Sequence, residues 1–128
     1  MYKTILMIIL AVVSTGAAAE WSEIGGDNEV TVYIDPPTVR QSGDKAIVWM
    51  MIDYRSGKVF KNGKFLSTKV KSEFDCKKKQ TRNVYMFIYS GNMGVGDVLY
   101  KGKNLNLKWN PIVPGMVGDG EFKTACGK

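Results

Sequence analysis

Residues 65–76, FLSTKVKSEFDC, are the stretch that determines the expected fold of this 128-residue chain. From its fourth residue onward, apolar or small side chains alternate with charged ones, which is typical of a β-strand with one covered face and one solvated face. Cys76 falls on the same side of this strand as Val70 and Phe74. Its sulfur is therefore expected to face the covered side of a sheet, where a C-terminal segment carrying Cys126 could lie and be bonded to it.

Residues 1–19 have the pattern of a secretory signal peptide. Lys3 supplies a short positive start, residues 5–13 form an unbroken apolar run, and residues 17–19 are three alanines. A run of about nine apolar residues is short of the ~20 that a membrane-spanning helix requires. The three small residues fit a signal-peptidase site better, so the mature chain is expected to begin at Glu20.

The mature chain, residues 20–128, is long enough for one domain. No cysteine stands at the expected cleavage site, so it is not expected to be a lipoprotein. No later segment approaches spanning length, so no transmembrane segment is expected. Export would place the protein in the periplasm, outside the cell, or peripherally on the cell surface.

The only two cysteines of the chain both lie in its mature part. An exported chain passes through an oxidising compartment, so a Cys76–Cys126 disulfide is the leading assignment. A metal pair and a reactive thiol are the alternatives. The chain has no histidine and no CxxC motif, which disfavours metal ligation and leaves a thiol without an imidazole base.

The remaining patterns predict an α+β fold, a single antiparallel sheet of about six strands with one C-terminal helix packed on one face and tethered by the disulfide. Strands are expected at residues 21–26, 28–35, 46–54, 65–76, 81–90 and 97–100. Pro36 and Pro37 are expected to end the second strand, and residues 55–64 to form a loop or a loose hairpin. The helix is expected at residues 116–126. Its covered face would carry Gly118, Phe122, Ala125 and Cys126.

The residues give little support to an enzyme. There is no histidine for general-base chemistry, no nucleophile elbow and no phosphate-binding glycine loop, so no cofactor and no metal are expected. The segment GNMGVGD, residues 91–97, does not match the dinucleotide fingerprint and is interpreted as a mobile turn. Asp53 is interpreted as a strand-end carboxylate satisfied by the backbone or by Arg55.

The formal charge of the chain is +6, and it is unevenly distributed. Residues 55–82 hold ten basic and two acidic side chains, which predicts an acidic protein or a polyanionic surface as partner. The expected partner-binding residues are Lys58, Lys61, Lys64, Lys77, Lys78, Lys79 and Arg82. The alternative is that these cations only solvate a strand face and its loops. Because the chain is expected to be exported, no nucleic-acid partner is expected.

The order of these pieces resembles the surface-adhesin protein E family of Gram-negative bacteria, over roughly residues 28–128. The resemblance is carried by a strand ending VYID at Asp35, by Ser67, Val70 and Cys76 in the organising strand, by Gly94 and Gly96, and by Ala125-Cys126. It implies a six-stranded antiparallel sheet with a C-terminal helix tethered to one face by a disulfide. It also implies an exported or cell-surface binding protein, and host matrix proteins as possible partners, because the namesake of the family binds host matrix and serum proteins.

Two hypotheses for the function follow. The first is a non-catalytic binding module that meets its anionic partner through the basic residues. The second is a periplasmic envelope protein that holds a small apolar ligand in a groove between sheet and helix, lined by Trp49, Met51 and Phe87.

Overall fold

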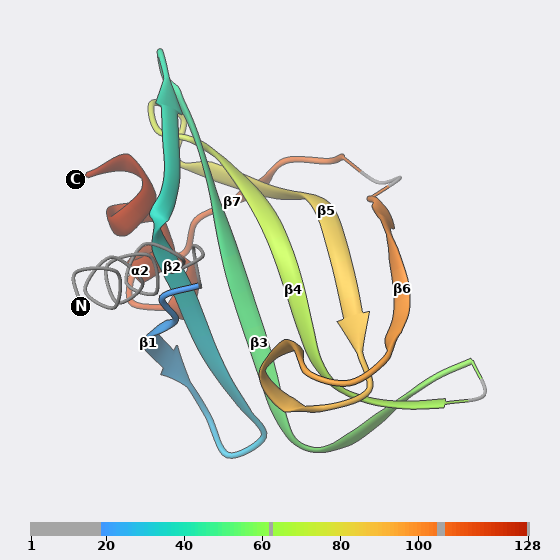
Figure 1. The fold of residues 1–128 in the computed structure, drawn as a ribbon. Helices are drawn as coiled ribbons and strands as arrows, with labels where there is room; N and C mark the ends of the chain where they lie inside the picture. Colours follow the sequence, from blue (N-terminus) through green and yellow to red (C-terminus); the bar gives the residue numbers. More distant parts are fainter. Residues whose placement is uncertain (1–18, 62, 105–106, 128) are drawn as a thin grey trace, which may run out of the picture.

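The computed structural model describes residues 19–61, 63–104 and 107–127, so the expected signal peptide lies, except for Ala19, outside the described residues. Six strands form one sheet in chain order, each antiparallel to its neighbours, and a short seventh strand pairs with β5 (Figure 1). The strands are β1 (Ser22–Gly26), β2 (Val30–Ser42), β3 (Lys45–Phe60), β4 (Gly63–Asp75), β5 (Gln80–Tyr89), β6 (Val98–Lys103) and β7 (Asn110–Pro111). The described residues also form a 3-10 turn, η1 (Asn92–Gly94), and one helix, α2 (Val117–Cys126). The expected fold class is confirmed.

The two prolines do not end the second strand, contrary to expectation. β2 continues past Pro36 and Pro37 to Ser42, and its register with β3 shifts between Asp35 and Arg40. The prolines stand in this irregular stretch, where the ladder does not need their missing N–H groups. The Thr38 hydroxyl replaces the lost pairing: it donates to the Asp35 carbonyl at 2.6 Å and accepts the Trp49 N–H at 3.0 Å.

Residues 55–61 and 63–64 belong to the outer end of a long β3–β4 hairpin. The ladder shifts register between Asp53 and Lys58 and then resumes, pairing Lys58 with Phe65 and Phe60 with Gly63. The aromatic rings of Phe60 and Phe65 meet edge to face, with centroids 6.4 Å apart. This contact supplies apolar cover at the tip, so the expected loose hairpin is in fact an extension of both strands.

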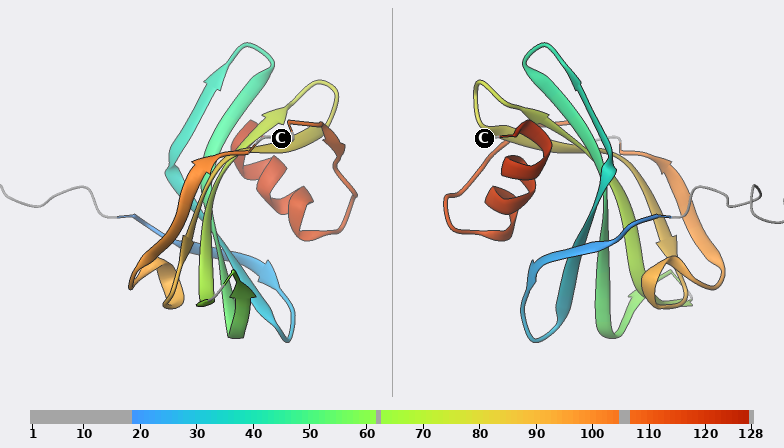
Figure 2. Two further views of the ribbon diagram at one scale, coloured as in Figure 1. Left: turned by 90° about the vertical axis from the view of Figure 1, so that its right-hand side faces the viewer. Right: turned by 60° about the vertical axis from the view of Figure 1, so that its left-hand side comes forward.

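Helix α2 covers only one face of the sheet, over β1 to β4 (Figure 2). The core between them contains Ile34, Val48 and Phe74, which are at most 1% exposed. From the helix, Phe122 packs its ring edge to face against Phe74, with centroids 6.2 Å apart, and Ala125 is fully buried. The alternation expected for β4 is thereby confirmed, because Phe74 points towards the helix.

The helix is held at its C-terminal end. The Cys76–Cys126 disulfide is present, with the two Cα atoms 5.7 Å apart. Gln41 of β2 donates its side-chain N–H to the Ala125 carbonyl at 2.9 Å, which satisfies one of the carbonyls that a helix end leaves unpaired. Gly127 then ends the helix in the left-handed conformation at a φ of 72°.

The predicted ligand groove between the sheet and the helix is not found there. The space between them is filled by the buried side chains of the core. Trp49, Met51 and Phe87 were expected to line it, but their strand positions put them on the opposite face of the sheet, because residues of odd and even number alternate along β3 and β5. The hypothesis of a ligand held between sheet and helix is therefore set aside.

Replacing Cys76 and Cys126 together with alanine is expected to lower the free energy of unfolding by about 4 kcal/mol, because the bond closes a loop with a sequence separation of 50. Urea denaturation of the variant and of the native protein measures the loss. Reducing agent added to the native protein should reproduce it. Unchanged unfolding midpoints under both treatments would contradict the role given to the crosslink.

Glu121 on α2 should make the stability depend on pH. It is half-buried, and desolvation raises its pKa from 4.5 to about 7. None of the ion pairs found among the described residues involves it. Because the folded state favours the protonated carboxyl, this group adds stability that is fully present below pH 4.5 and is lost as the pH rises through about 7.

The variant Glu121→Gln is therefore expected to be more stable than the native protein at mildly alkaline pH, by about 1–3 kcal/mol, and equal to it at acidic pH. Thermal melts across this pH range test the expectation. Glu23→Gln, at an exposed glutamate of β1, is the matched control. A gain for Glu121→Gln that does not change with pH would show that the carboxyl is not the titrating group.

Candidate functional site

The face of the sheet opposite α2, here called the open face, carries lysines and aromatic rings in rows that run across the strands. Two neighbouring rows share the order lysine, ring, lysine over β4, β5 and β6. These rows are Lys71–Tyr85–Lys103 and Lys69–Phe87–Lys101. Cross-strand partners point to the same side of a sheet, so the four lysines surround the two rings. Lys69, Lys71, Lys101 and Lys103 are called the lysine lattice below.

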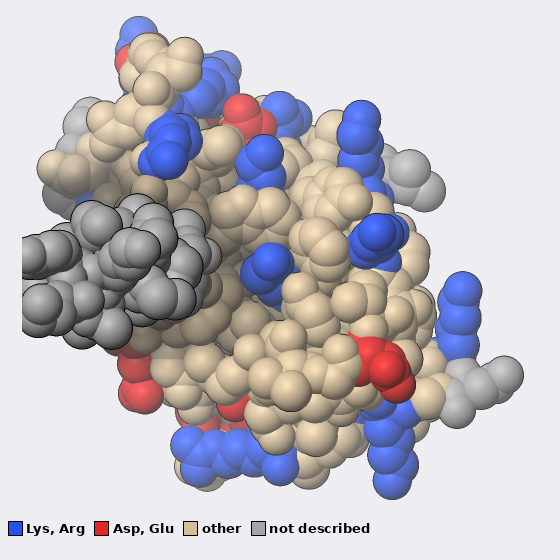
Figure 3. All heavy atoms as spheres, viewed as in Figure 1, with Lys and Arg blue, Asp and Glu red and all other residues tan. Residues whose placement is uncertain are grey.

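The spacing of the lysine lattice follows from the geometry of the sheet. Lysines in one row are two strands apart, about 10 Å between backbones, and lysines on one strand are two residues apart, about 7 Å. None of the ion pairs found among the described residues involves any of them. Figure 3 shows basic side chains distributed over this face, with few acidic ones between them. The lattice therefore presents cationic charge that no carboxylate within the described chain neutralises.

Trp49 of β3 extends the aromatic part of this face. Its ring lies 5.9 Å from that of Phe87 and 6.4 Å from that of Tyr85, centroid to centroid. The Lys69 ammonium sits above two of these rings, 5.1 Å from the Trp49 centroid and 4.7 Å from the Phe87 centroid. Such cation–π contacts hold the ammonium at the surface of the rings while leaving its outer side open to an anion.

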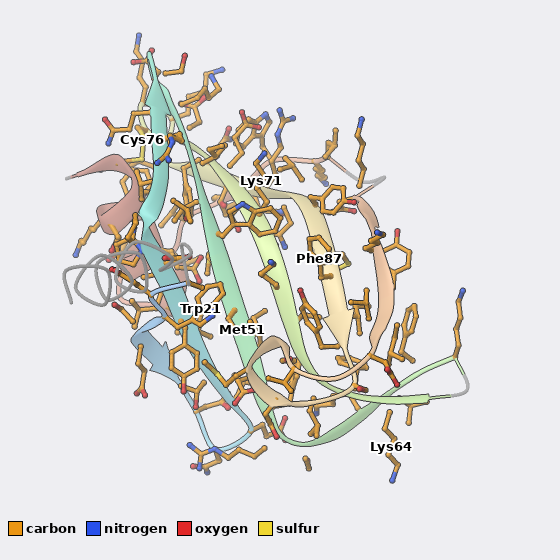
Figure 4. The ribbon with its side chains drawn as sticks, viewed as in Figure 1. Trp21, Met51, Lys64, Lys71, Cys76 and Phe87 are labelled. Carbon is orange, nitrogen blue, oxygen red and sulfur yellow. A yellow bond between two sulfur atoms is a disulfide. The ribbon has the colours of Figure 1, made fainter. Side chains whose placement is uncertain are left out.

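Two hollows flank Trp49. One has a volume of about 430 Å³ and is lined mainly by Trp49, Tyr85 and Phe87, with Lys71 and Lys103 beside them. The other, of about 520 Å³, lies towards β2 and the start of the described chain. In Figure 4, Lys71 and Phe87 stand on neighbouring strands at the first hollow, and Trp21 stands near the second. The open face thus combines charge with concave apolar surface.

The glycine-containing segment 91–97 closes one end of the open face. Asp53 accepts the Met93 N–H at 2.8 Å and a side-chain N–H of Asn92 at 3.0 Å. Asp53 is therefore satisfied by the backbone, one of the two expected alternatives. The buried Ser67 hydroxyl donates to the Gly91 carbonyl at 2.7 Å and accepts the Gly94 N–H at 2.9 Å. The segment is a turn, as expected. Its hydrogen bonds to Asp53 and to Ser67 attach it to the sheet at two positions.

The partner-binding residues expected from the sequence fall at two ends of the molecule. Lys58, Lys61 and Lys64 are at the tip of the β3–β4 hairpin, where Lys58 pairs with Glu29 at 3.5 Å and Lys61 lies 5.6 Å from the Phe60 ring centroid. Lys64 is exposed at this tip (Figure 4).

The other expected residues lie at the opposite end of β4. Lys77, Lys78 and Lys79 are exposed in the turn to β5, where the Asp75 carboxylate accepts the N–H groups of Lys77 and Lys78 at 3.1 and 2.9 Å. The hydrogen bond from Lys78 is the largest cause that lowers the pKa of Asp75. Arg82 is paired with Glu73 at 2.8 Å and stacks 4.1 Å from the Trp109 ring centroid.

The two ends are separated by nearly the whole of β4, roughly 35–40 Å at the usual rise per residue. The structure therefore brings together three lysines at the hairpin and, separately, the turn lysines with Arg82 nearby. It does not join the two groups into one surface. Lys69 and Lys71, between them on the same strand, belong to the lysine lattice instead.

Sequence reasoning missed the contribution of Lys101 and Lys103. Their strand was expected to end at residue 100, whereas β6 runs to Lys103. It also interpreted aromatic stripes as core, whereas Tyr85 and Phe87 are only half-buried on the open face. The available signal was the alternation of rings in β5 opposite the alternation of lysines in β4.

Within the described part of the chain, no group of three histidine, cysteine, aspartate or glutamate side chains is arranged to hold a metal ion. In the same part of the chain, no helix has the length and apolar character needed to cross a membrane. The geometry of the open face is that of a binding surface with cations, rings and hollows.

Comparison with known proteins agrees with this fold. A family model described as surface-adhesin protein E matches residues 21–127. A structure of Haemophilus influenzae protein E superimposes with a TM-score of 0.64 at 12% identity, covering 88% of each chain. Its crystal form II gives 0.59 at 12% identity, over 87% of this chain and 97% of that one. The protein from non-typeable H. influenzae gives 0.58 at 13% identity, over 90% and 82%. No curated protein matches the sequence.

Replacing Ser67 with alanine is expected to destabilise the protein by about 2–3 kcal/mol, because the Gly91 carbonyl and the Gly94 N–H both lose their buried partner. Urea denaturation measures the stability, and hydrogen exchange at the Gly94 amide measures local opening. Ser56→Ala, at an exposed serine of β3, is the control. Unchanged exchange at Gly94 would mean that the segment is held by other contacts.

Proposed function

Because this chain belongs to the surface-adhesin protein E family, we propose that it is an exported, non-catalytic binding protein that holds an anionic partner on its open face. The partner is an acidic protein or a polyanionic surface, and host matrix proteins are one source of it. Residues 1–19 act as the signal peptide and are removed. It then works in the periplasm, as a secreted protein, or peripherally on the cell surface.

The lysine lattice is the observation that carries this proposal. The sheet fixes the backbone positions of its cations at regular spacing, so only the lysine side chains, and not the backbone, need to be ordered when an anion binds. They also surround half-buried rings, from which water is easily displaced. A polyanion carries several negative groups, so it can contact several of these lysines at once. Each contact then adds to the binding free energy.

The hollow of about 430 Å³ beside Trp49 supports selectivity within this function. Its apolar wall accommodates a ring or an aliphatic part of the partner, while Lys71 and Lys103 meet the acidic groups beside it. Charge alone attracts any polyanion, whereas a shaped hollow favours a partner with the matching apolar part. The binding would therefore be more selective than that of an unstructured basic segment.

The cations at the two ends of β4 have a different part in the proposed function. Lys58 and Arg82 are already paired with carboxylates, and the remaining lysines there stand on a hairpin tip and a turn. Exposed charges of this kind raise the rate of encounter with an anion and are screened by salt. They are proposed to attract the partner, and the lysine lattice to hold it.

Charge reversal of Lys71 and Lys103 to glutamate is expected to weaken binding to immobilised heparin, a sulfated polyanion, by about tenfold or more, or ~1.4 kcal/mol. The control is Lys77→Glu with Lys78→Glu, which makes the same change in net charge at a distant turn and should alter affinity by about twofold or less. The same pair of variants is tested on an acidic matrix protein.

Binding is measured at low and at high salt, and circular dichroism verifies that each variant is folded. Equal losses for the two double variants would show that net charge, not the open face, determines binding. A loss on heparin alone would assign the partner to polyanionic surfaces, and a loss on the acidic protein alone would assign it to proteins.

A further inference from the structure

Asp35 is a buried carboxylate at the edge of the open face. Its side chain belongs to β2, where Asp35 pairs with Trp49 of β3, and the residue is only 6% exposed. Its Oδ1 atom accepts a hydrogen bond from the backbone nitrogen of Glu20 at 3.1 Å. None of the ion pairs found among the described residues involves Asp35. A buried carboxylate normally has a cation as its partner, so this site calls for one.

The two cations that line the same hollow, Arg40 and Lys69, do not pair with Asp35. Arg40 donates one Nη1 atom to the carbonyls of Pro37 and Val39, at 2.8 Å each. Lys69 lies above the rings of Trp49 and Phe87, as described above. Neither makes an ion pair with Asp35. The group that does contact the carboxylate is the nitrogen of Glu20, which is the first residue of the expected mature chain.

We propose, resting on the removal of residues 1–19 in the proposed function, that the new α-ammonium group of Glu20 forms an ion pair with Asp35. Hydrolysis breaks the bond between the Ala19 carbonyl carbon and the Glu20 nitrogen. Water supplies the hydroxyl of the Ala19 carboxyl group and a proton to the Glu20 amine, which takes up a second proton near neutral pH. The nitrogen that now donates a neutral N–H at 3.1 Å becomes the cation that the carboxylate lacks.

Two further observations support cleavage at this bond. Ala19 and Glu20 are both exposed and precede β1, which begins at Ser22, so the bond between them lies in an accessible, unpaired stretch. Ala17-Ala18-Ala19 supplies the small residues that a signal peptidase requires. The position of the hydrogen bond and the pattern of the sequence therefore point to the same nitrogen.

The ion pair has a consequence for the open face. It fixes the start of the chain against β2, next to Trp21, which lines the hollow together with Asp35 and Trp49. A charge-assisted hydrogen bond is about twice as strong as a neutral one. The uncleaved chain has only the neutral N–H at this position. Removal of the leader would therefore strengthen the bond to Asp35, fix Trp21 at the hollow and stabilise the domain.

The first test is the N-terminus itself. Intact mass and N-terminal sequencing of the exported protein should identify Glu20 as its first residue. A mature chain that begins at any other residue overturns the proposal, since the ammonium group would then be displaced from Asp35.

The second test compares two chains released from a fusion, one that begins at Glu20 and one that begins at Ala19. The extra residue moves the ammonium about 3.5 Å along the chain. The Glu20 chain is expected to melt about 4 °C higher, and the variant Asp35→Asn should abolish the difference. Glu20→Ala, which removes the side-chain carboxylate and leaves the α-ammonium group in place, should preserve it. A difference that persists with Asp35→Asn overturns the proposal.

If Asp35→Asn does not fold, titration of the Glu20 α-amino group by NMR decides the question. Pairing with a carboxylate raises the pKa of an ammonium above its usual value of about 7.7–8.0. The added stability of the Glu20 chain should then be fully present below that value and be lost as the pH rises through the raised pKa. An α-amino pKa at or below the usual value overturns the proposal.

Discussion

The crosslink between Cys76 and Cys126 determines which face of the sheet is covered. A ten-residue helix that contains Gly118 and Gly120 has little intrinsic stability, so its position depends on docking and on the covalent bond. The disulfide attaches its last turn beside Phe74, and Phe122 then fills the core below it. Since the helix is short, it covers one face over four strands, and no second helix covers the other face in the described part of the chain.

Aromatic rings on the uncovered face of the sheet expose apolar surface to water. In this protein lysines lie beside these rings. The methylene groups of a lysine cover apolar surface while its ammonium group stays in water. Lys69 above Trp49 and Phe87 is the clearest example. The side chains that cover the rings of the open face are therefore the same ones that make it cationic.

Much of the fold could be predicted from the sequence, because it depends on alternation and on two cysteines. The alternation in residues 65–76 correctly placed Phe74 and Cys76 towards the helix, and the spacing of Phe122, Ala125 and Cys126 correctly predicted the helical face. The continuation of β2 past Pro36 could not be predicted, since it depends on the Thr38 hydroxyl meeting the N–H of Trp49 on another strand. The candidate site was predicted less well. Charge density along the chain selected two ends of β4, whereas the lysine lattice depends on the register between β4, β5 and β6, which no local pattern specifies.

The likeness to the solved structures, at 12% identity, concerns the fold alone. In this chain the fold is held by the buried side chains under the helix and by the crosslink that attaches the helix. On the open face Lys101 and Lys103 are exposed, whereas Met51 and Ser67 are buried under the segment 91–97. The same scaffold can then carry different rows of side chains without a loss of stability. The partner proposed for this chain is therefore argued from its own rows, Lys71–Tyr85–Lys103 and Lys69–Phe87–Lys101, and is not transferred from a relative that shares only the scaffold.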